Sequence, residues 1–506
     1  MKLFFINPPS NFSYVDVSVW MEPLGLAYIS AVCRDAGHDV RIRDMFNSKV
    51  EDARRLFAEL DEFQPDVVGF TAMTENFKNG LEFARAVKAR YGCKVVYGGW
   101  HVSGDPSAIL DPAVDCVVIG EGEETILEVL DCFEGKMQIE EVQGIAYKTR
   151  DGYQATERRT RIKRITSIPF PMREGLPINQ FQFHAMLTHP VKKSRFLSVQ
   201  ASRGCPYKCT FCQTPALWGS AWTSRTPESV VDELEHLANN YGVNNVFFRD
   251  EEFTVRPRWV VEICNEIVRR GMEKSLRWGS FARVDDMSKE LVDTMYAAGS
   301  RYMVLGLEAT DTERGAKMKK HYDIEEASAS LRMIADKGIT ISGGWIIGFP
   351  WDTPESLEKS FQWLLKQPID MLGVFFVTPF AGTEFRRQVD EQGLLLTDDT
   401  DHFNIREATV KTPHIPTKEL YRLRQEFTRR YYLRPAYVGH LLKKMYIRPE
   451  LIRIIPEAIL SFAFKGRLPN MLLKQDTEEG AVSNYFAYKL PAELYRPLRL
   501  QTQFAA

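Results

Sequence analysis

The sequence lacks long apolar runs and has little net charge. No uninterrupted apolar stretch approaches the roughly 18 to 20 residues that cross a bilayer. Its 65 basic and 67 acidic side chains give a net charge of −2, which argues against a general polyanion-binding surface and against a nucleic-acid partner. The opening residues MKLFFINPPS hold one lysine and a short apolar run, which suits a buried strand better than a signal peptide. We therefore expect a soluble cytoplasmic protein.

The sequence has no excess of cysteine, since eight residues in 506 is an ordinary number, but their distribution is uneven. Five of the eight are dispersed among mostly apolar neighbours, as reduced core thiols are: Cys33, Cys93, Cys116, Cys132 and Cys264. The other three, Cys205, Cys209 and Cys212, fall within one stretch of eight residues. This clustering marks them as candidates for chemistry.

The content of apolar and aromatic residues predicts a folded chain with several domains. Apolar residues make up 44% and aromatic residues 12% of the sequence, which excludes a disordered chain. A length of 506 residues exceeds one ordinary core and suggests roughly two to four domains.

Short apolar runs alternate with helical patterns over the first 140 residues. The runs predicted as buried strands are Lys2–Ile6, Val40–Ile42, Val67–Phe70, Val95–Tyr97 and Cys116–Ile119. Segments between them, such as Leu24–Asp35 and Phe77–Lys88, carry apolar residues at helical spacing. The alternation predicts parallel strands with right-handed crossovers, and so a doubly wound, Rossmann-like α/β domain over residues 1–140.

The residues that follow these strands form a candidate binding edge, because ligands of doubly wound sheets bind beyond the carboxyl ends of the strands. They are small, polar or glycine-rich: Asn7-Pro8-Pro9-Ser10, Thr71-Ala72-Met73-Thr74, Gly98-Gly99-Trp100-His101 and Gly120-Glu121-Gly122-Glu123. Glycine at such places lets a bulky planar ligand approach the backbone. We therefore expect a shared binding site along this edge.

A connector and a second alternating region follow. Residues 141–192 are predicted to be a connector without obvious chemistry, with Gly152 at a hairpin turn. Over residues 193–395 we predict six strands: Leu197–Ser202, Val246–Arg249, Arg277–Phe281, Tyr302–Leu307, Ser342–Ile347 and Gly373–Val377. Six such repeats make a partial (β/α)6 barrel of TIM type, whose chemistry belongs at the C-terminal strand ends.

The remaining residues, 396–506, are predicted to be mainly helical and carry an excess of positive charge. Tyr421–Gln475 holds twelve Arg or Lys against three Glu, so the near-neutral total conceals a basic region on an acidic body. Within it, Ile452–Phe464 is strongly apolar and flanked by cations. A helix packed on the barrel is the first interpretation, and a peripheral membrane contact or an apolar or anionic substrate is the alternative. A nucleic-acid role for this region is a weaker option.

The strongest chemical signal is a loop that directly follows the first predicted barrel strand. It reads Arg203-Gly204-Cys205-Pro206-Tyr207-Lys208-Cys209-Thr210-Phe211-Cys212. Three thiolates in one tight loop can hold three irons of a four-iron, four-sulfur cluster, and the absence of a fourth cysteine leaves one iron open to another ligand. Structural zinc is the weaker alternative, because it needs four ligands and the nearest histidine, His189, precedes the strand.

This motif resembles the hallmark of the radical S-adenosylmethionine (SAM) superfamily, which is C-x3-C-x2-C with an aromatic residue, here Phe211, before the last cysteine. The resemblance implies that Cys205, Cys209 and Cys212 ligate the catalytic cluster and that SAM chelates the open iron. One electron, from an external donor of flavodoxin or ferredoxin type, then cleaves SAM to methionine and a 5′-deoxyadenosyl radical. That radical abstracts a hydrogen atom from an otherwise inert carbon.

Residues at the later strand ends fit the same resemblance. The triplet Asp250-Glu251-Glu252 could accept hydrogen bonds from the SAM ammonium, although in isolation such a triplet is more often a solvated loop. Arg283 could pair with the SAM carboxylate. The resemblance adds Phe211, Glu308 at the end of the fourth strand, and Gly348, which lies in the glycine-containing stretch near adenine in this superfamily.

The N-terminal edge resembles a cobalamin-binding domain. A small hydroxyl residue in Thr71-Ala72-Met73 and the pair Gly98-Gly99 resemble elements that admit the nucleotide tail and the corrin edge. Together with INPP, PLGLAYIS, GGWH, GEGEET and the barrel, the pattern resembles the cobalamin-binding radical SAM family over roughly residues 1–400. The resemblance implies cobalamin contacts by Asn7, Pro8, Pro9, Thr71, Met73, Gly98, Gly99, Trp100, His101, Gly120, Glu121 and Gly122.

One familiar element of cobalamin domains is missing. The motif D-x-H-x-x-G, whose histidine binds cobalt from below, is replaced by Asn7-Pro8-Pro9-Ser10-Asn11. The lower face of the cobalt would then be left to water or to a non-ligating side chain. His101 could ligate the cobalt, contact the corrin or its tail, or be purely structural, and the three alternatives stay open.

The resemblance implies a methyltransferase that acts on an unactivated carbon through methylcobalamin. A second candidate is a non-methylating cyclase, oxidase or ring-rearranging enzyme of the anaerobic oxidative cyclase type, and a candidate of another class is a non-catalytic cobalamin or iron–sulfur sensor. A methylthiotransferase is disfavoured because the N-terminal cysteines are too dispersed to hold a second cluster. We expect a small-molecule substrate, and a lipid, tetrapyrrole or polyketide-like compound before a peptide.

Overall fold

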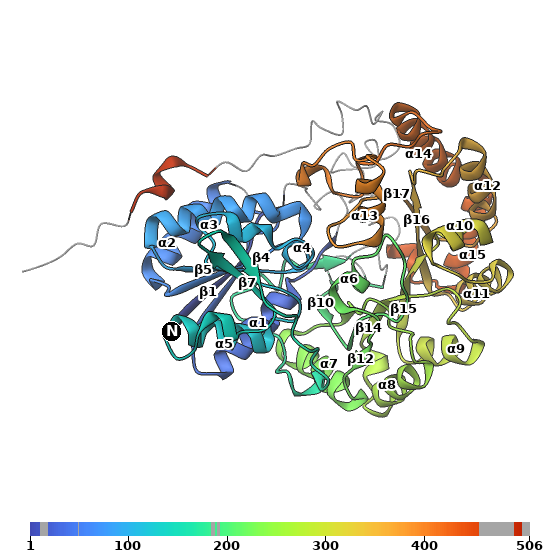
Figure 1. The fold of residues 1–506 in the computed structure, drawn as a ribbon. Coiled ribbons are helices and arrows are strands. Elements are labelled where there is room, and N and C mark those ends of the chain that lie inside the picture. Colours follow the sequence, from blue (N-terminus) through green and yellow to red (C-terminus); the bar gives the residue numbers. More distant parts are fainter. Residues whose placement is uncertain (11–18, 49, 184–187, 190–192, 455–489, 498–506) are drawn as a thin grey trace, which may run out of the picture.

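The computed structural model describes residues 1–10, 19–48, 50–183, 188–189, 193–454 and 490–497 (Figure 1). Its N-terminal part is a seven-stranded sheet in the order β3-β1-β4-β5-β6-β7-β8. The first five strands of that order run parallel: β3 (Asp39–Asp44), β1 (Lys2–Asn7), β4 (Val67–Thr71), β5 (Lys94–Gly98) and β6 (Cys116–Val118). Strand β1 is buried from Leu3 to Asn7, as expected of a strand that is covered on both faces.

Helices cover both faces of this sheet. Alternate strand residues enter two different apolar cores, because successive side chains of a strand point to opposite faces. Leu3 and Phe5 pack toward α1 (Leu24–Asp35) and α5 (Glu123–Phe133). Phe4 and Ile6 pack toward α2 (Val50–Phe63) and α3 (Phe77–Tyr91). The predicted doubly wound α/β domain is confirmed.

The predicted connector contributes two strands to the same sheet. β7 (Ile145–Thr149) pairs antiparallel with β6, and β8 (Gly152–Ala155) pairs antiparallel with β7. Gly152, with a φ of 134°, begins β8 at the predicted hairpin turn. The hairpin joins the sheet because Ile145 and Ala146 are fully buried in its two cores.

The second α/β unit is an open barrel of six strands that are parallel and follow one another in chain order. They are β10 (Phe196–Val199), β13 (Asn245–Phe248), β14 (Arg277–Ala282), β15 (Ser300–Gly306), β16 (Thr340–Ile347) and β17 (Met371–Phe376). Helices between the strands pack outside them: α7 (Pro227–Tyr241), α8 (Pro257–Arg269), α9 (Lys289–Ala297), α11 (Ile324–Asp336) and α12 (Pro354–Leu365). All six predicted strands are confirmed.

Two further helices close the end of the barrel at β16 and β17. In α14 (Thr417–Tyr432) the Tyr431 hydroxyl donates to the Ile369 carbonyl at 2.7 Å, and in α15 (Pro435–Ile447) the Tyr437 hydroxyl donates to the Asp370 carbonyl at 2.6 Å. All but the first three residues of the apolar stretch Ile452–Phe464 lie outside the described residues. No helix within the described residues is long and apolar enough to cross a membrane.

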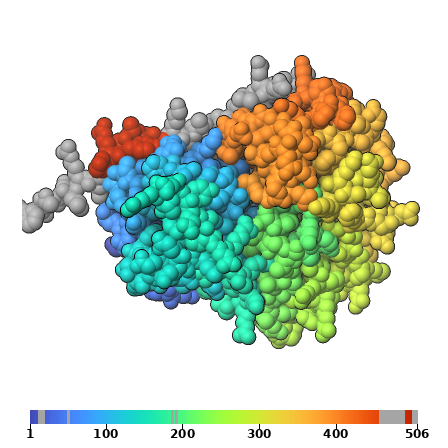
Figure 2. All heavy atoms as spheres, in the orientation of Figure 1, coloured from blue at the N-terminus to red at the C-terminus, as the bar shows by residue number. Residues whose placement is uncertain are grey.

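The two α/β units meet along a broad seam (Figure 2). One apolar core runs from α1 and α5 into the barrel. Lys78 of α3 forms an ion pair with Asp401 at 3.3 Å, on the segment that follows the barrel. Residues 490–497 return to the N-terminal domain, where Tyr495 donates a hydrogen bond of 2.6 Å to Glu82. Of these contacts, the shared apolar core and the Lys78–Asp401 ion pair join the two units.

Candidate active site

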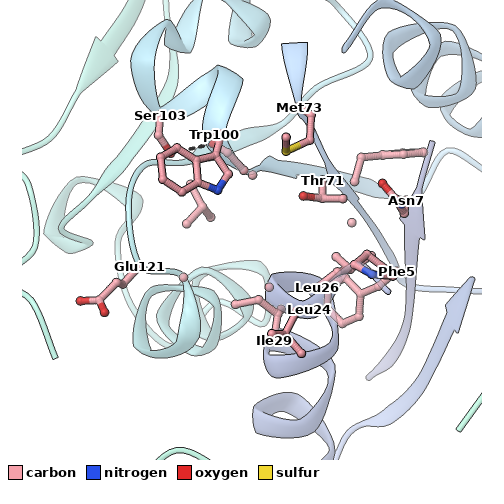
Figure 3. A pocket seen from close by; sticks show the side chains of 18 of the residues that line it. Phe5, Asn7, Leu24, Leu26, Ile29, Thr71, Met73, Trp100, Ser103 and Glu121 are labelled. Carbon is pink, nitrogen blue, oxygen red and sulfur yellow. Dashed lines mark hydrogen bonds between the residues drawn. The ribbon is translucent and has the colours of Figure 1, made fainter. Parts of the chain in front are cut away.

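A cavity of about 410 Å³ lies at the seam (Figure 3). Its wall in the N-terminal domain is made by apolar side chains and glycines of four strands and two helices, among them Phe5, Gly69, Val96, Val118, Leu26, Ile29 and Ile126. In Figure 3, Thr71, Met73 and Trp100 lie across the cavity from Leu24, Leu26 and Ile29 of α1. The barrel contributes the opposite wall with Gln200, Arg203, Leu217, Trp218, Arg249 and Glu251.

Three of the glycines that line this cavity are Gly69, Gly98 and Gly99. A Cβ atom on Gly69 would stand 2.5 Å from the Phe5 ring. Gly99 has a φ of 108°, and a Cβ there would stand 2.7 Å from backbone atoms of Ala72, so glycine is required. A Cβ on Gly98 would instead meet no atom nearer than 4.0 Å. The cavity therefore fits a bulky, largely apolar, planar group laid against the strand ends.

The structure brings together most of the residues predicted to contact cobalamin. Those that line the cavity are Asn7, Thr71, Met73, Gly98, Gly99, Trp100, Gly120, Glu121 and Gly122. Pro8, Pro9 and His101 do not line it. Pro8 and Pro9 are buried, and the Pro9 carbonyl accepts a hydrogen bond of 2.8 Å from Asn79. Asn7 donates its amide to Asp44 at 2.7 Å, and burial raises the pKa of Asp44 to about 6.

His101 is packed inside the N-terminal domain. Its Nδ1 lies 3.2 Å from the Thr74 hydroxyl, and its ring centroid lies 4.1 Å from that of Phe77. Burial lowers the pKa of His101 to about 4, so the ring is neutral at pH 7. Among the three alternatives for this residue, these contacts favour the structural one.

The loop with three cysteines leaves the barrel at a glycine that no other residue could replace. β11 (Ser202–Arg203) pairs with β12 (Thr223–Ser224), and Gly204 then turns the chain with a φ of 88°. A Cβ on Gly204 would stand 2.1 Å from the Ala221 carbonyl oxygen. Further along, Thr210 donates its N–H to Met318 and its carbonyl accepts from Phe385, at 3.0 and 2.9 Å. The loop is thus fixed at both ends.

All three thiols of the loop are free and partly exposed. Burial raises the pKa of Cys205 to about 12 and that of Cys209 to about 11, and the charges of the neighbouring thiols add to both shifts. Within the described residues, no three His, Cys, Asp or Glu side chains are placed to hold one metal ion. A cluster binds its thiolates at separate irons, and its positive charge favours the thiolate form. The loop therefore suits a cluster.

The acidic triplet after β13 divides its side chains between different partners. Asp250 accepts from the Ala201 N–H at 3.1 Å, Glu251 from the Trp218 indole at 2.8 Å and Glu252 from the Thr254 N–H at 2.9 Å. Burial raises the pKa of both Asp250 and Glu252 to about 7. Glu251 lines the cavity, whereas the charge of Glu252 acts on Cys205. Asp250 and Glu252 are buried and Glu251 is partly buried, so the triplet is not a solvated loop.

Charged side chains gather near the cysteines at the mouth of the barrel. Arg283 lies 3.7 Å above the ring of Tyr207, which belongs to the cysteine loop, and forms an ion pair of 2.8 Å with Asp285. Glu308 is buried against Lys320, whose charge acts on Cys209. A small zwitterion with an ammonium and a carboxylate could exchange partners with these two pairs.

Two residues predicted to contact SAM have mainly packing contacts. The ring of Phe211 lies 6.1 Å from that of Phe349, within a small apolar core. Gly348 donates its N–H to Asp352 at 2.8 Å, and a Cβ there would meet Leu420 of α14 at 3.0 Å. Their predicted contact with SAM stays a prediction.

Sequence reasoning missed three side chains at the site. Arg203 and Trp218 line the cavity from the barrel side, and Lys320 pairs with Glu308. Arg203 stood next to the cysteine motif, which was a usable signal. Lys320 stands in a run of lysines that looks like a solvated surface, so its burial could not be read from the sequence.

Each of the two α/β units matches the model of a known protein family. Residues 15–130 match the model of the B12 binding domain, and residues 199–364 match that of the Radical SAM superfamily. Together these matches cover more than half of the chain.

Relatives and solved structures are similar to this chain over a length that includes both units. The chain is 28% identical over 426 residues to the hopanoid C-3 methylase of Methylococcus capsulatus, a match that covers 83% of this chain and 78% of the relative. It is 27% identical over 431 residues to the anaerobic magnesium-protoporphyrin IX monomethyl ester cyclase of Cereibacter sphaeroides, with 83% and 68% covered. The methyltransferase TsrM from Kitasatospora setae, solved with cobalamin and a 4Fe-4S cluster, shares the fold at 19% identity with a TM-score of 0.70, and 86% and 89% are covered.

Proposed function

The chain belongs to the radical SAM superfamily, among the members that carry a B12-binding domain ahead of the barrel, and we propose that it methylates an unactivated carbon of a small molecule. The observation that carries the proposal is the cavity at the seam, which is lined by residues of both units. Arg203, one of these residues, lies two positions before Cys205. One site between the two units can therefore serve both cofactors.

The residues present fit both groups. When bound, cobalamin supplies a cobalt–carbon bond that breaks homolytically, and the cluster with SAM supplies the radical that activates the substrate. Cys205, Cys209 and Cys212 would hold the cluster, and the glycine-lined strand ends would hold the corrin. The apolar walls exclude water, which protects a reactive carbon centre from side reactions.

Product analysis tests the proposal. The purified chain, loaded with both cofactors under anaerobic conditions, is incubated with SAM, a reductant and an extract of a strain that lacks the gene. We expect a product heavier by one CH2 unit together with S-adenosylhomocysteine. A product of altered hydrogen or oxygen content, with no S-adenosylhomocysteine, would exclude methylation.

That second outcome would favour the cyclase class. The observation that supports it is the similarity to the magnesium-protoporphyrin cyclase, which covers most of the chain. The residues described above bind cofactors, and they do so whether or not a methyl group is transferred. The position of the substrate over the cavity decides between the two outcomes.

We propose a lipid or tetrapyrrole as the substrate class, ahead of a polyketide-like compound or a peptide. The cavity is mainly apolar, and the two relatives named above are a hopanoid methylase and a porphyrin-ester cyclase. The single electron for SAM cleavage would come from a flavodoxin or ferredoxin type donor. A reducing compartment preserves thiolate ligands and a reduced cluster, and we therefore propose that the reaction takes place in the cytoplasm.

We further propose that α15 rests on an anionic lipid surface. Val438, Leu442 and Tyr446 follow one another at intervals of four residues and are 56%, 59% and 88% exposed. Along the chain, the exposed cations Arg429 of α14 and Arg453 precede and follow this stripe. Such an arrangement suits a membrane interface, where apolar side chains insert and cations meet headgroups.

Vesicle binding tests this contact. Leu442→Glu should weaken binding to phosphatidylglycerol vesicles on the order of tenfold, because it removes one buried leucine from the interface. Val268→Glu, at an apolar position of α8 that is 45% exposed, is the matched control and should bind as the parent chain does. Equal binding by both variants, or no binding by the parent chain, would exclude the contact.

A further inference from the structure

Arg203 joins the two units of the molecule at the start of the cysteine loop. It is the last residue of β11, two positions before Cys205, and is 5% exposed. Its guanidinium reaches across the seam, where Nη1 lies 3.0 Å from Glu121 and Nη2 lies 2.5 Å from Glu123. Both glutamates belong to the N-terminal domain. The two ion pairs are therefore buried and connect different units.

The two glutamates stand on the element that closes the cavity. Glu121 lies within the glycine turn at the end of β6, and Glu123 is the first residue of α5. Glu121 also accepts a hydrogen bond of 2.8 Å from the Ile162 N–H. Because Glu121 and Glu123 stand beside the cavity, their ion pairs fix the position of the Arg203 side chain relative to the cavity.

The other contacts of Arg203 fix it on the barrel side. Its Nε donates to Gln200 at 3.2 Å, and its carbonyl accepts from Arg161 at 3.2 Å. The next residue, Gly204, donates its N–H to Glu251 at 2.9 Å. With all three nitrogens of the guanidinium engaged, the side chain has a single arrangement. The fork of donors is also one that lysine cannot reproduce.

We propose that Arg203 is a positioning residue that sets the distance between the cysteine loop and the cobalamin cavity. The proposal rests on the proposed function in one respect, which is that both cofactors serve one reaction. In such a reaction the reacting groups must meet within a narrow range of geometry, and a displacement of about 1 Å can lower the rate on the order of 100-fold. A buried fork between the two binding elements limits that displacement.

The experiment measures the distance between the cofactors and does not need the substrate. In the loaded protein, the reduced cluster and cobalamin in its paramagnetic Co(II) state are both electron spins, so the cluster speeds the relaxation of the cobalt signal according to their separation. Iron and cobalt contents are measured first in Arg203→Gln and Arg203→Lys, and the relaxation is compared only between fully loaded samples. Both variants should change the relaxation of the cobalt signal, and Arg203→Lys should change it less.

The matched control is Arg448→Gln. Arg448 is also buried, at 2%, pairs with Glu450 at 2.8 Å, and donates at 3.2 Å to Thr340, the first residue of β16, at the end of the barrel away from the cysteine loop. The Arg448→Gln variant should be less stable than the parent chain, and the relaxation of its cobalt signal should be unchanged. If Arg203→Gln does not fold, the same measurement on Arg203→Lys and on Glu123→Gln decides the proposal.

Failure of the positioning role and failure of the proposed methylation give different results. Relaxation in the folded Arg203 variants that equals that of the parent chain would overturn the positioning role, whatever the reaction. A changed relaxation together with a product that lacks the added CH2 would keep the positioning role and overturn the proposed methylation.

Discussion

The cavity of the N-terminal domain and the mouth of the barrel lie side by side but are built on different principles. The cavity is formed by apolar side chains and by bare backbone at Gly69, Gly98 and Gly99. The mouth of the barrel is formed by charges, with Arg283 against Asp285 and Glu308 against Lys320. The cavity is therefore open without a ligand, whereas the charged side chains at the mouth of the barrel are paired with one another.

The difference follows from the ligands that the two regions suit. A large planar group gains its binding free energy from buried area, which requires a preformed hole and tolerates few polar groups. A small zwitterion gains it from charge-assisted hydrogen bonds, and paired side chains can exchange partners without leaving a charge unmatched. Changes of volume should therefore impair the first region and changes of charge the second.

The largest effect is expected when Cys205, Cys209 and Cys212 are replaced together by alanine. Iron content and the formation of 5′-deoxyadenosine under reducing, anaerobic conditions should both be lost, because no other residue of the loop can ligate a cluster. Cobalt content should remain, since the cavity is untouched. Continued 5′-deoxyadenosine formation would show that this loop is not the cluster site. If the parent chain binds both cofactors but forms no 5′-deoxyadenosine, the non-catalytic sensor is favoured.

A change of volume alone is made by Gly98→Phe. A Cβ atom at Gly98 meets no atom nearer than 4.0 Å, so the backbone accepts a side chain here, and Gly98 lines the cavity. We expect cobalamin affinity to fall by about 100-fold, or about 2.8 kcal/mol, with SAM binding unchanged. Gly98→Ala is the control and should have a much smaller effect. Equal affinities of the two variants, measured by cobalamin titration, would contradict this location.

A change of charge alone is made by Glu308→Gln, which keeps the shape of the side chain. It removes a charge-assisted contact worth about 1.5 to 3 kcal/mol, so the KM for SAM should rise about 10- to 100-fold. The cobalt content should not change. Glu313→Gln, at an exposed carboxylate of α10 (Thr312–Met318), provides the control. An unchanged KM in Glu308→Gln would remove this residue from the SAM site.

A change of pH leaves both cofactor regions intact and tests the buried carboxyl of Asp44. Burial raises its pKa from 3.8 to about 6, so the folded chain binds more protons than the unfolded chain between these values. Stability therefore falls as pH rises from about 4 to 6, by up to about 3 kcal/mol, and the loss is complete above pH 6. In Asp44→Asn this loss should be absent.

Thermal unfolding at several pH values checks this linkage. The Tm of Asp44→Asn relative to that of the parent chain should increase between pH 4.5 and 7. Asp398→Asn, at a carboxylate that is 90% exposed, should show no such trend. A constant difference between Asp44→Asn and the parent chain would mean that Asp44 titrates as an ordinary surface carboxyl does.

Most of the framework could be predicted from the sequence because it depends on local pattern. The six barrel strands and the parallel strands of the first domain stand out as apolar runs, and three cysteines within eight residues mark the cluster loop. The glycines that line the cavity follow from the rule that ligands bind at strand ends.

The rest depends on contacts between distant parts of the chain. Arg203 and Glu121 are 82 residues apart, and their pairing exists only because the two units meet. The motif Asn7-Pro8-Pro9 looked like one binding element, yet only Asn7 lines the cavity, since packing turns the prolines inward. The three carboxylates after β13 point to different partners, which no spacing rule predicts.

In the proposed function, both cofactor regions serve one methyl transfer. The direct test supplies the loaded protein with SAM whose methyl group carries deuterium, together with the extract described above. We predict a labelled product, with S-adenosylhomocysteine and 5′-deoxyadenosine formed together. Formation of 5′-deoxyadenosine with an unlabelled product and no S-adenosylhomocysteine would contradict the claim.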